Sequence, residues 1–352
     1  MLPLQVQTAY AELLQRFRSA PQTSIDGSIL RVEKAGRSYW VARRRIGNTI
    51  SEQSIGPDSP EIQASVQVAL QKQSVAADWN RDNARLVAML RSAACLTPDQ
   101  STGKILLALD RIGFFRSGGI LGGTHAFRHY PLHLGADVPQ TAYAMTGDID
   151  VLAPAHMVLA GDDGSLTARL SKAGLAMRTV FGLTEDDPQK SVIDGTVALE
   201  ILGPVGRGGA TSYRHKGVGE HLQARRYLDY AFKDPVQTVS LYRSGVLVTI
   251  PSPQRYALHK LLIAQLRKGD FALKKQKDLN QADWLVAILA ETQPYDLWEA
   301  WNDLSKRGVM WRKLAQASLN QRPEIGQRII QIQDEFGPVA GSNPLRSNVN
   351  NP

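Results

Sequence analysis

The sequence predicts an α+β fold, with a mixed β-sheet core between an N-terminal β-ribbon with helices and a C-terminal helical domain. Residues 28–57 alternate around two glycines, and short strand-like runs recur between residues 114 and 202. From residue 252 onward the apolar residues follow helical spacing. The chain has 352 residues, of which 43% are hydrophobic and 21% charged, which is enough for two domains and a substantial core.

Residues 1–99 are predicted to form an N-terminal unit. Val6, Tyr10 and Leu13 have helical spacing and indicate a helix over residues 4–18. Two or three antiparallel strands follow, and they carry the basic run 43–45, which would either grip phosphates or form a solvated hairpin face. Ser59 before a proline marks the start of a long helix with at most one break.

Residues 100–251 are predicted to form the core. A helix is expected over about residues 99–111, and FFRSGGILGG indicates a buried strand that runs into a glycine turn. AHMVLA and TVALEIL are further strand candidates. The glycine-rich, basic stretch GPVGRGGATSYRHKGVGEH is expected to be a mobile loop that could close over a substrate.

Residues 252–336 are predicted to be a helical domain. SPQRYALHKLLIAQLRKG and KKQKDLNQADWLVAILAE are amphipathic, and two or three more helices follow. Trp284, Trp298, Trp301 and Trp311 are expected in its core rather than as base-stacking platforms. The polar tail 337–352, rich in Gly, Pro and Asn, is expected to be disordered.

Composition limits the class of protein and its partners. No apolar run approaches the roughly 18 residues of a membrane span, and the N-terminus lacks the pattern of a signal peptide. A single cysteine, Cys95, excludes an intramolecular disulfide framework and favours a cytoplasmic protein. The net charge of +8 is compatible with RNA or DNA as a partner, or with nucleotide substrates alone.

The segment MTGDIDVL has the alternation of a strand, so Asp148 and Asp150 are expected on one face and Ile149 on the other. Two adjacent carboxylates repel each other unless a cation lies between them, and they are the hard oxygen ligands that divalent metals prefer. The simpler alternative is a surface turn with two solvated acids.

The second motif is Gly122, Gly123 and Thr124, at the predicted end of a strand and the start of a helix. Glycines let a phosphate approach the backbone closely, and the threonine could cap the helix or bind that phosphate. Taken alone, this motif is better explained by a helix that starts in a close turn.

The order of the two motifs, 24 positions apart, is that of the nucleotidyltransferase fold of polymerase-beta-like enzymes. That fold uses a third carboxylate on a neighbouring strand. Glu200 points out of an otherwise apolar strand and is the first candidate, with Asp194 as the alternative.

Over most of its length the sequence also resembles a bacterial family of nucleotidyltransferase-fold proteins. The words that carry the resemblance include SYWVARRRIG, GGILGGTHAF, MTGDIDV, RRYLDYAF and GVLVTIPSPQRYALHKLLIAQLRKG. The family is similar to the nucleotidyltransferase toxins of abortive-infection and toxin–antitoxin systems. That resemblance assigns a phosphate-binding role to Lys260 and to the pair Lys277 and Asp278. The sequence departs from the family's pattern at His125 and Phe127.

Helical spacing places Arg267 seven residues after Lys260, so that either could neutralise a triphosphate, and it places Asp278 and Gln281 one turn apart. His125, His129 and His133 are spaced by four, but a proline interrupts the set, which favours packed or exposed histidines over a metal site.

The resemblance implies a metal-dependent nucleotidyltransferase that moves an NMP from an NTP such as ATP to an acceptor hydroxyl. Mg²⁺, or Mn²⁺ in its place, would be held by Asp148, Asp150 and Glu200. The expected acceptor is RNA, the tRNA 3′ end above all, with a protein or small molecule as alternatives, and an antitoxin is an expected partner. The competing interpretation is a degenerate fold that only binds RNA or protein.

Overall fold

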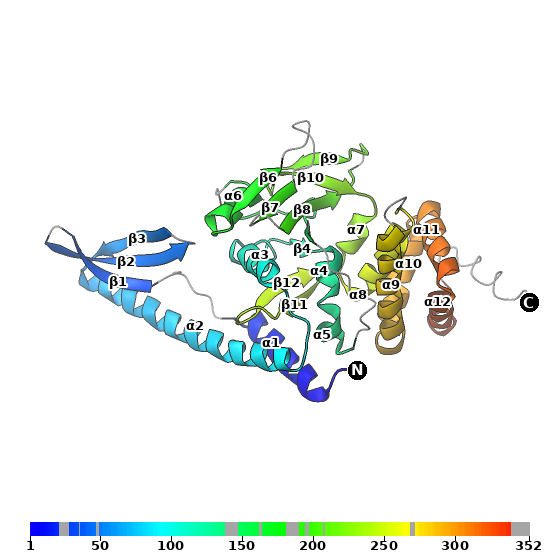
Figure 1. Cartoon of the computed structure of the whole chain (residues 1–352), viewed down its shortest axis with the longest axis horizontal. Coiled ribbons are helices and arrows are strands. Elements are labelled where there is room, and N and C mark those ends of the chain that lie inside the picture. The colour runs from blue at the N-terminus through cyan, green and yellow to red at the C-terminus, as the bar shows by residue number, and fades with distance from the viewer. Residues whose placement is uncertain are drawn as a thin grey trace, which may run out of the picture.

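The structure is a computed structural model. It describes the chain in ten stretches: residues 1–20, 28–34, 36–46, 49–137, 147–161, 164–180, 190–193, 197–206, 208–267 and 272–338. They form a mixed α+β protein, which confirms the predicted fold class. Figure 1 shows a core sheet between an N-terminal arm on one side and a group of C-terminal helices on the other.

The N-terminal arm is a three-stranded antiparallel sheet against the first half of a long helix (Figure 1). Its elements are α1 (Leu4–Arg18), β1 (Ser28–Lys34), β2 (Arg37–Ile46), β3 (Thr49–Pro57) and α2 (Pro60–Ser92). The side chain of Ser59 accepts a hydrogen bond from the backbone of Ile62, so the predicted N-cap is confirmed. Helix α2 runs through 33 residues without the break that the sequence allowed, because no Gly or Pro follows Pro60 inside it.

Helix α1 ties the arm to the core. Val6, Tyr10 and Leu13 pack against α2 and against Val239 and Leu241 of the core. The hydroxyl of Tyr10 accepts a hydrogen bond of 3.0 Å from the backbone N–H of Val239. The predicted helix over residues 4–18 is therefore present and buries its apolar face as expected.

The core is a seven-stranded sheet with the path β4-β5-β8-β10-β9, to which the β6–β7 hairpin is added through β7. Strand β8 is parallel to both β5 and β10, and β4 is antiparallel to β5. The strands are β4 (Ile120–Leu121), β5 (Asp148–Leu152), β6 (Met177–Val180), β7 (Lys190–Ile193), β8 (Val197–Pro204), β9 (Ser212–His215) and β10 (Glu220–Arg225). A separate hairpin comprises β11 (Val236–Ser240) and β12 (Val246–Ile250).

Short helices connect these strands. They are α3 (Gln100–Arg111), α4 (Gly123–Phe127), α5 (Tyr130–Leu134), α6 (Leu166–Lys172) and α7 (Leu228–Ala231). One apolar core runs through the middle and C-terminal parts of the chain. It extends from Leu106 in α3 through Ile149 and Leu199 in the sheet to Leu261 and Leu285 in the C-terminal helices.

Three local predictions for this region are wrong. The strand predicted in FFRSGGILGG is present only at its end, as β4 before the glycine turn, whereas FFRSGG is folded into turns, in which the backbone N–H groups of Phe114 and Gly119 donate to the carbonyl oxygens of Leu109 and Phe114. AHMVLA is not a strand: Met157 and Leu159 are buried alternately, but only Leu159 bonds across, to Gly217. The glycine-rich stretch is not a loop throughout, because β9 and the start of β10 form an antiparallel hairpin within it.

The C-terminal helices are α8 (Pro253–Ala264), α9 (Ala272–Thr292), α10 (Pro294–Lys306), α11 (Val309–Gln321) and α12 (Pro323–Phe336). Trp284 and Trp301 are buried among them, with Trp298 and Trp311 partly buried against the same core, as predicted. Helix α8 stops at Ala264, so Arg267 lies beyond it rather than two turns along it. The predicted disordered tail falls mostly at 339–352, outside the described residues.

None of the helices described here is both long and apolar enough to cross a membrane.

Candidate active site

The three predicted carboxylates lie on two adjacent parallel strands. Asp150 of β5 is directly opposite Glu200 of β8, and Asp148 is opposite Ala198. Because side chains alternate along a strand, Asp148, Asp150 and Glu200 share one face of the sheet, while Ile149 lies fully buried on the other. Asp194, the alternative third carboxylate, lies outside the described residues.

Asp150 is the most perturbed acid of this group. Its pKa is raised to about 6, chiefly by burial and then by the negative charges of Glu200 and Asp148, while the charge of Lys260 acts against them. A carboxyl group with this pKa lies where negative charge is costly, so a bound cation would stabilise the ionised site.

The donor atoms suit a hard divalent cation, since all three side chains offer carboxylate oxygens. In the part of the chain that the structure describes, however, no three His, Cys, Asp or Glu side chains are gathered closely enough to hold a metal ion. The residues thus supply the right chemistry without a preassembled cage, and a metal would have to draw the carboxylates together.

The Gly-Gly-Thr turn lies directly on Asp150. The backbone N–H of Gly122 donates to the carbonyl oxygen of Asp150 at 2.8 Å. Gly123 has a φ of +55°, and a Cβ atom there would be 2.1 Å from Oδ2 of Asp150. Only glycine therefore fits, both for its left-handed backbone and for the close approach of the carboxylate. The predicted helix after the turn is short, because α4 ends at Phe127.

The cations that the family resemblance singled out come from the C-terminal helices. Nζ of Lys277 in α9 donates a 3.0 Å hydrogen bond to Oγ1 of Thr124, which joins the helical domain to the glycine turn. Lys277 is partly buried, and burial together with the nearby charge of Lys260 lowers its pKa. An anion bound at this position would stabilise the charged form of the ammonium group.

Lys260 and Arg267 have another partner. Lys260 lies 2.5 Å from Oδ1 of Asp278, and Nε of Arg267 lies 3.1 Å from Oδ2. Burial acts to raise the pKa of Asp278, but the charges and hydrogen bonds of these two cations outweigh it and hold that pKa below its ordinary value. The predicted residues are therefore together, with Asp278 as the counter-ion of Lys260.

Sequence analysis missed Tyr256 of α8. Its hydroxyl group lies 2.9 Å from the carbonyl oxygen of Gly123 and 3.0 Å from Oε1 of Gln281. Nζ of Lys260 lies 5.1 Å from the centre of its ring. The available signal was the spacing, since Tyr256 is one helical turn before Lys260 on the same face.

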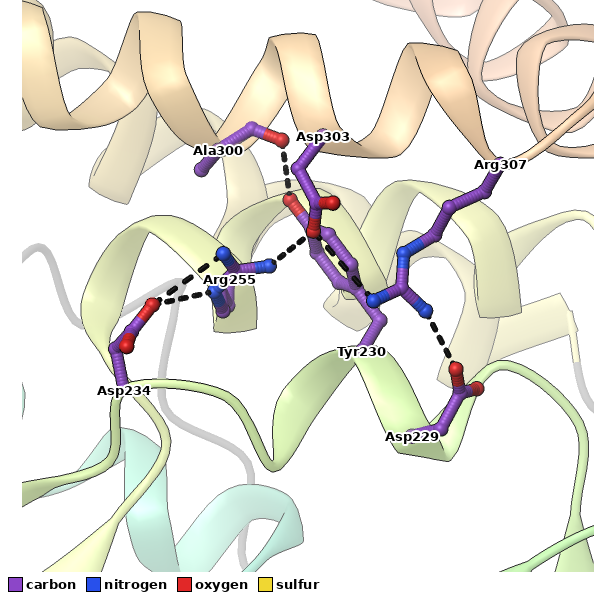
Figure 2. Close-up of polar contacts among 7 residues, drawn as sticks. All are labelled: Asp229, Tyr230, Asp234, Arg255, Ala300, Asp303 and Arg307. Carbon is purple, nitrogen blue, oxygen red and sulfur yellow. Dashed lines mark hydrogen bonds and ion pairs between the residues drawn. The ribbon is translucent and has the colours of Figure 1, made fainter.

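A second polar cluster fixes α8 from the side of Arg255, as Figure 2 shows. The guanidinium group of Arg255 is buried and lies 2.7 Å from Asp303 of α10 and 3.3 Å from Asp234. It also lies over the ring of Tyr230, whose hydroxyl donates to the carbonyl oxygen of Ala300. Helix α8 is thereby held at Arg255 against α7 and α10, one residue before Tyr256.

The histidines are packed as the sequence indicated. His125 is buried, and Nε2 has no hydrogen-bond partner among the described residues. Burial, followed by the charge of Arg128, lowers its pKa to about 4, and burial does the same for His129. Neutral imidazoles in the apolar interior agree with a packing role rather than a metal site.

A protein-family model described as nucleotidyltransferase matches residues 100–306, more than half of the chain. Among solved structures, a nucleotidyltransferase-like antigenic protein from Paracoccidioides brasiliensis is similar at 12% sequence identity and a TM-score of 0.37, over 67% of this chain and 94% of that one. No curated protein matches.

Proposed function

The chain belongs to the nucleotidyltransferase family whose model spans residues 100–306, and on that premise we propose that it transfers an NMP from an NTP to a hydroxyl group of an acceptor. The acceptor oxygen forms a bond to the α-phosphorus, and the bond from that phosphorus to the bridging oxygen of the β-phosphate breaks. Pyrophosphate leaves, and the hydroxyl proton passes to water.

The observation that carries this proposal is the contact of three elements at one point. The turn at Gly123 lies against the carboxylate of Asp150, and Lys277 reaches the Thr124 hydroxyl of the same turn. Transfer of a nucleotidyl group depends mainly on positioning the phosphates and stabilising their charge. A glycine turn, paired carboxylates and a lysine are groups that can do this.

The roles follow from position. Backbone N–H groups of the turn, Thr124 and Lys277 would bind the triphosphate and the leaving pyrophosphate. Lys260 and Arg267, which are paired with Asp278, would add positive charge near the triphosphate. Asp148, Asp150 and Glu200 would hold Mg²⁺ or Mn²⁺, which when bound neutralises phosphate oxygens and acidifies the acceptor hydroxyl.

For the acceptor we favour RNA, with the tRNA 3′ end as the specific candidate and a role in the cytoplasm as a toxin or defence protein with an antitoxin partner. The support is the net charge of +8, which suits a polyanionic partner. A protein hydroxyl group is the alternative acceptor.

A non-catalytic binding module is the second candidate. It is favoured by the spread of the carboxylates, which are not gathered for a metal, and by the use of both Lys260 and Arg267 to neutralise Asp278. In that case the fold would bind RNA or a partner protein without transfer.

The test is transfer of label from each α-labelled NTP, with Mg²⁺, into total tRNA and into lysate protein. The Asp148→Ala/Asp150→Ala protein runs in parallel. Label in one class of acceptor, only with the intact aspartates, would support the proposed reaction. Unchanged labelling in the double variant would remove the carboxylates from it, and RNA binding that ignores both Mg²⁺ and NTP, without transfer, would favour the binding module.

A further inference from the structure

Positive charge is concentrated in residues 203–227. This segment contains five basic residues and one acidic residue, a net charge of +4, which is half of the chain's +8 in 25 of its 352 residues. The sequence suggested a mobile loop here, but β9 and β10 place Arg214 and Arg225 on the core sheet, while Lys216 and Arg226 lie in turns next to these strands. Arginines held on a sheet present their charge to a polyanion at fixed positions.

The register puts two of these cations, Arg214 and Arg225, on the carboxylate face. Gln223 of β10 pairs with Leu202 of β8, and Leu202 lies two residues after Glu200 on the same face. Alternation places Arg225 on that face as well. Arg214 of β9 pairs with His221, which is likewise two residues from Gln223, so Arg214 also lies on the side of the sheet that bears the acids.

The nearby acids are occupied elsewhere. Glu220, the one acid of the segment, is buried on the opposite face, where it accepts hydrogen bonds from the backbone and hydroxyl of Thr167. Figure 2 shows that the next two acids along the chain, Asp229 and Asp234, turn toward Arg307 and Arg255. None of the three therefore neutralises the cations of β9 and β10.

Those cations are accessible. Arg214, Lys216, Arg225 and Arg226 are all exposed, and among the described residues none of them forms an ion pair with a carboxylate. The guanidinium group of Arg225 donates instead to Oε1 of Gln223 at 2.7 Å, which holds it along the strand. We call Arg214 and Arg225, the two of these residues on the carboxylate face, the β9–β10 cations.

Arg214 and Arg225 lie at two different heights on the face that bears the acids. Strand β8 lies between β5 and β10, so Asp150 and Arg225 are on strands about 10 Å apart at the usual spacing of about 4.8 Å. Arg225 pairs with Pro204, four residues beyond Glu200, which adds about 13 Å along the strand. Arg214 is about level with Glu200, because its partner His221 lies two residues before Gln223. An extended polyanion of a few nucleotides could therefore reach from these two cations to the carboxylates.

We propose that the β9–β10 cations bind the phosphates of an RNA acceptor and lead its terminal hydroxyl to Asp148, Asp150 and Glu200. This inference rests on the proposed function for the fate of the RNA, but not for its binding. Contacts of arginine and lysine with phosphates carry affinity rather than sequence preference, so the surface would bind many RNAs and the site would select the end.

The test is the salt dependence of binding, without NTP or Mg²⁺, of a labelled 20-nucleotide single-stranded RNA and of bulk tRNA. The variant is Arg214→Gln/Arg225→Gln, and the matched control is Lys72→Gln/Arg91→Gln, which removes the same charge from exposed positions of α2. Each lost phosphate contact lowers the slope of log K against log salt by roughly 0.7 to 0.9. The sheet variant should therefore bind roughly 25- to 60-fold more weakly at about 0.1 M salt, with the control unchanged.

Equal losses in both variants would show that only overall charge matters and would overturn the proposal, as would no loss in either. Absence of RNA binding by the unmodified protein, with label transferred to protein, would overturn it too. RNA binding that depends on the β9–β10 cations, without any NMP transfer, would keep the surface and count against the proposed reaction. Thermal unfolding of each variant checks that folding is intact.

Discussion

The sharpest prediction concerns Gly123→Ala. The residue has a φ of +55°, where an L-residue costs about 1–2 kcal/mol, and this cost should appear as lower stability. The added methyl carbon would be 2.1 Å from Oδ2 of Asp150, whereas ordinary van der Waals contact begins at 3.4 Å. The carboxylate or the turn must therefore move by more than 1 Å.

Displacement on that scale is large for a reacting group. A misplacement of about 1 Å can cost roughly 100-fold in rate, so Gly123→Ala should lose at least that much in kcat/KM for NMP transfer. NTP binding, followed by calorimetry, should weaken as well, because the N–H groups of the turn would no longer face the triphosphate.

The matched control is Gly113→Ala. Gly113 also has a left-handed backbone, with a φ of +78°, but a Cβ atom there would meet nothing within 4 Å. Both variants should show a similar loss in the free energy of unfolding, measured in urea, and only Gly123→Ala should lose activity. If Gly123→Ala transfers label within a few-fold of the unmodified protein, the turn does not position Asp150, and the reasoning from the site's geometry fails.

Three further predictions concern charges in the interior. Burial lowers the pKa of His129 to about 4, so as pH falls the unfolded chain binds this proton before the folded protein does, and the histidine costs stability from about pH 6.5 toward pH 4. Between pH 7.5 and 5, His129→Asn should therefore lose roughly 2 kcal/mol less free energy of unfolding, measured in urea, than the unmodified protein. Arg255→Met removes a buried partner of two acids and should cost about 3–5 kcal/mol, whereas Arg81→Met breaks an exposed pair with Asp78 and should cost at most about 1 kcal/mol; equal costs would contradict the burial argument. Lys260→Met should destabilise the fold by a similar 3–5 kcal/mol, and adding Asp278→Asn should recover much of that loss; a double variant less stable than the single one would show that the pair is not the main role of the lysine.

Local signals made much of the fold predictable. The Ser59 cap and Pro60 fixed the start of α2, and the spacing of Val6, Tyr10 and Leu13 gave α1. The alternation around Ile149 gave β5 and the shared face of its two aspartates. These features depend on residues within one or two turns of each other, where sequence pattern and structure are closely linked.

Predictions failed where tertiary contacts decided the structure. The stretch that holds β9 looked like a loop because of its glycines, yet the pairing of its residues with β10, and of β10 with β8, makes it part of the sheet. The alternating burial of Met157 and Leu159 looked like a strand, although no ladder forms there. Propensity is a weak guide in both cases, because pairing between distant segments overrides it.

The candidate site divides in the same way. Sequence motifs named the acids, the turn and the lysines, but which of these meet is a matter of packing between α8, α9 and the sheet. Spacing places Tyr256 and Lys260 on one face of α8, but it shows neither the contact of the Tyr256 hydroxyl group with the carbonyl oxygen of Gly123 nor the pairing of Asp278 with two cations.

The pairing of Asp278 with two cations reduces the positive charge that the site can offer to a triphosphate. Three cations, Lys260, Arg267 and Lys277, approach the glycine turn or the acids, but one fully buried carboxylate, Asp278, holds two of them. Lys277 is bonded instead to a neutral hydroxyl group, and within the described residues it forms no ion pair with a carboxylate, so the more distant charge of Asp278 offsets it only in part. A triphosphate carries several negative charges and would enter beside three carboxylates, which one lysine cannot balance. Productive NTP binding therefore requires additional positive charge at Asp148, Asp150 and Glu200, so NTP affinity should depend steeply on divalent cation in this protein and should lose most of that dependence in Asp148→Ala/Asp150→Ala.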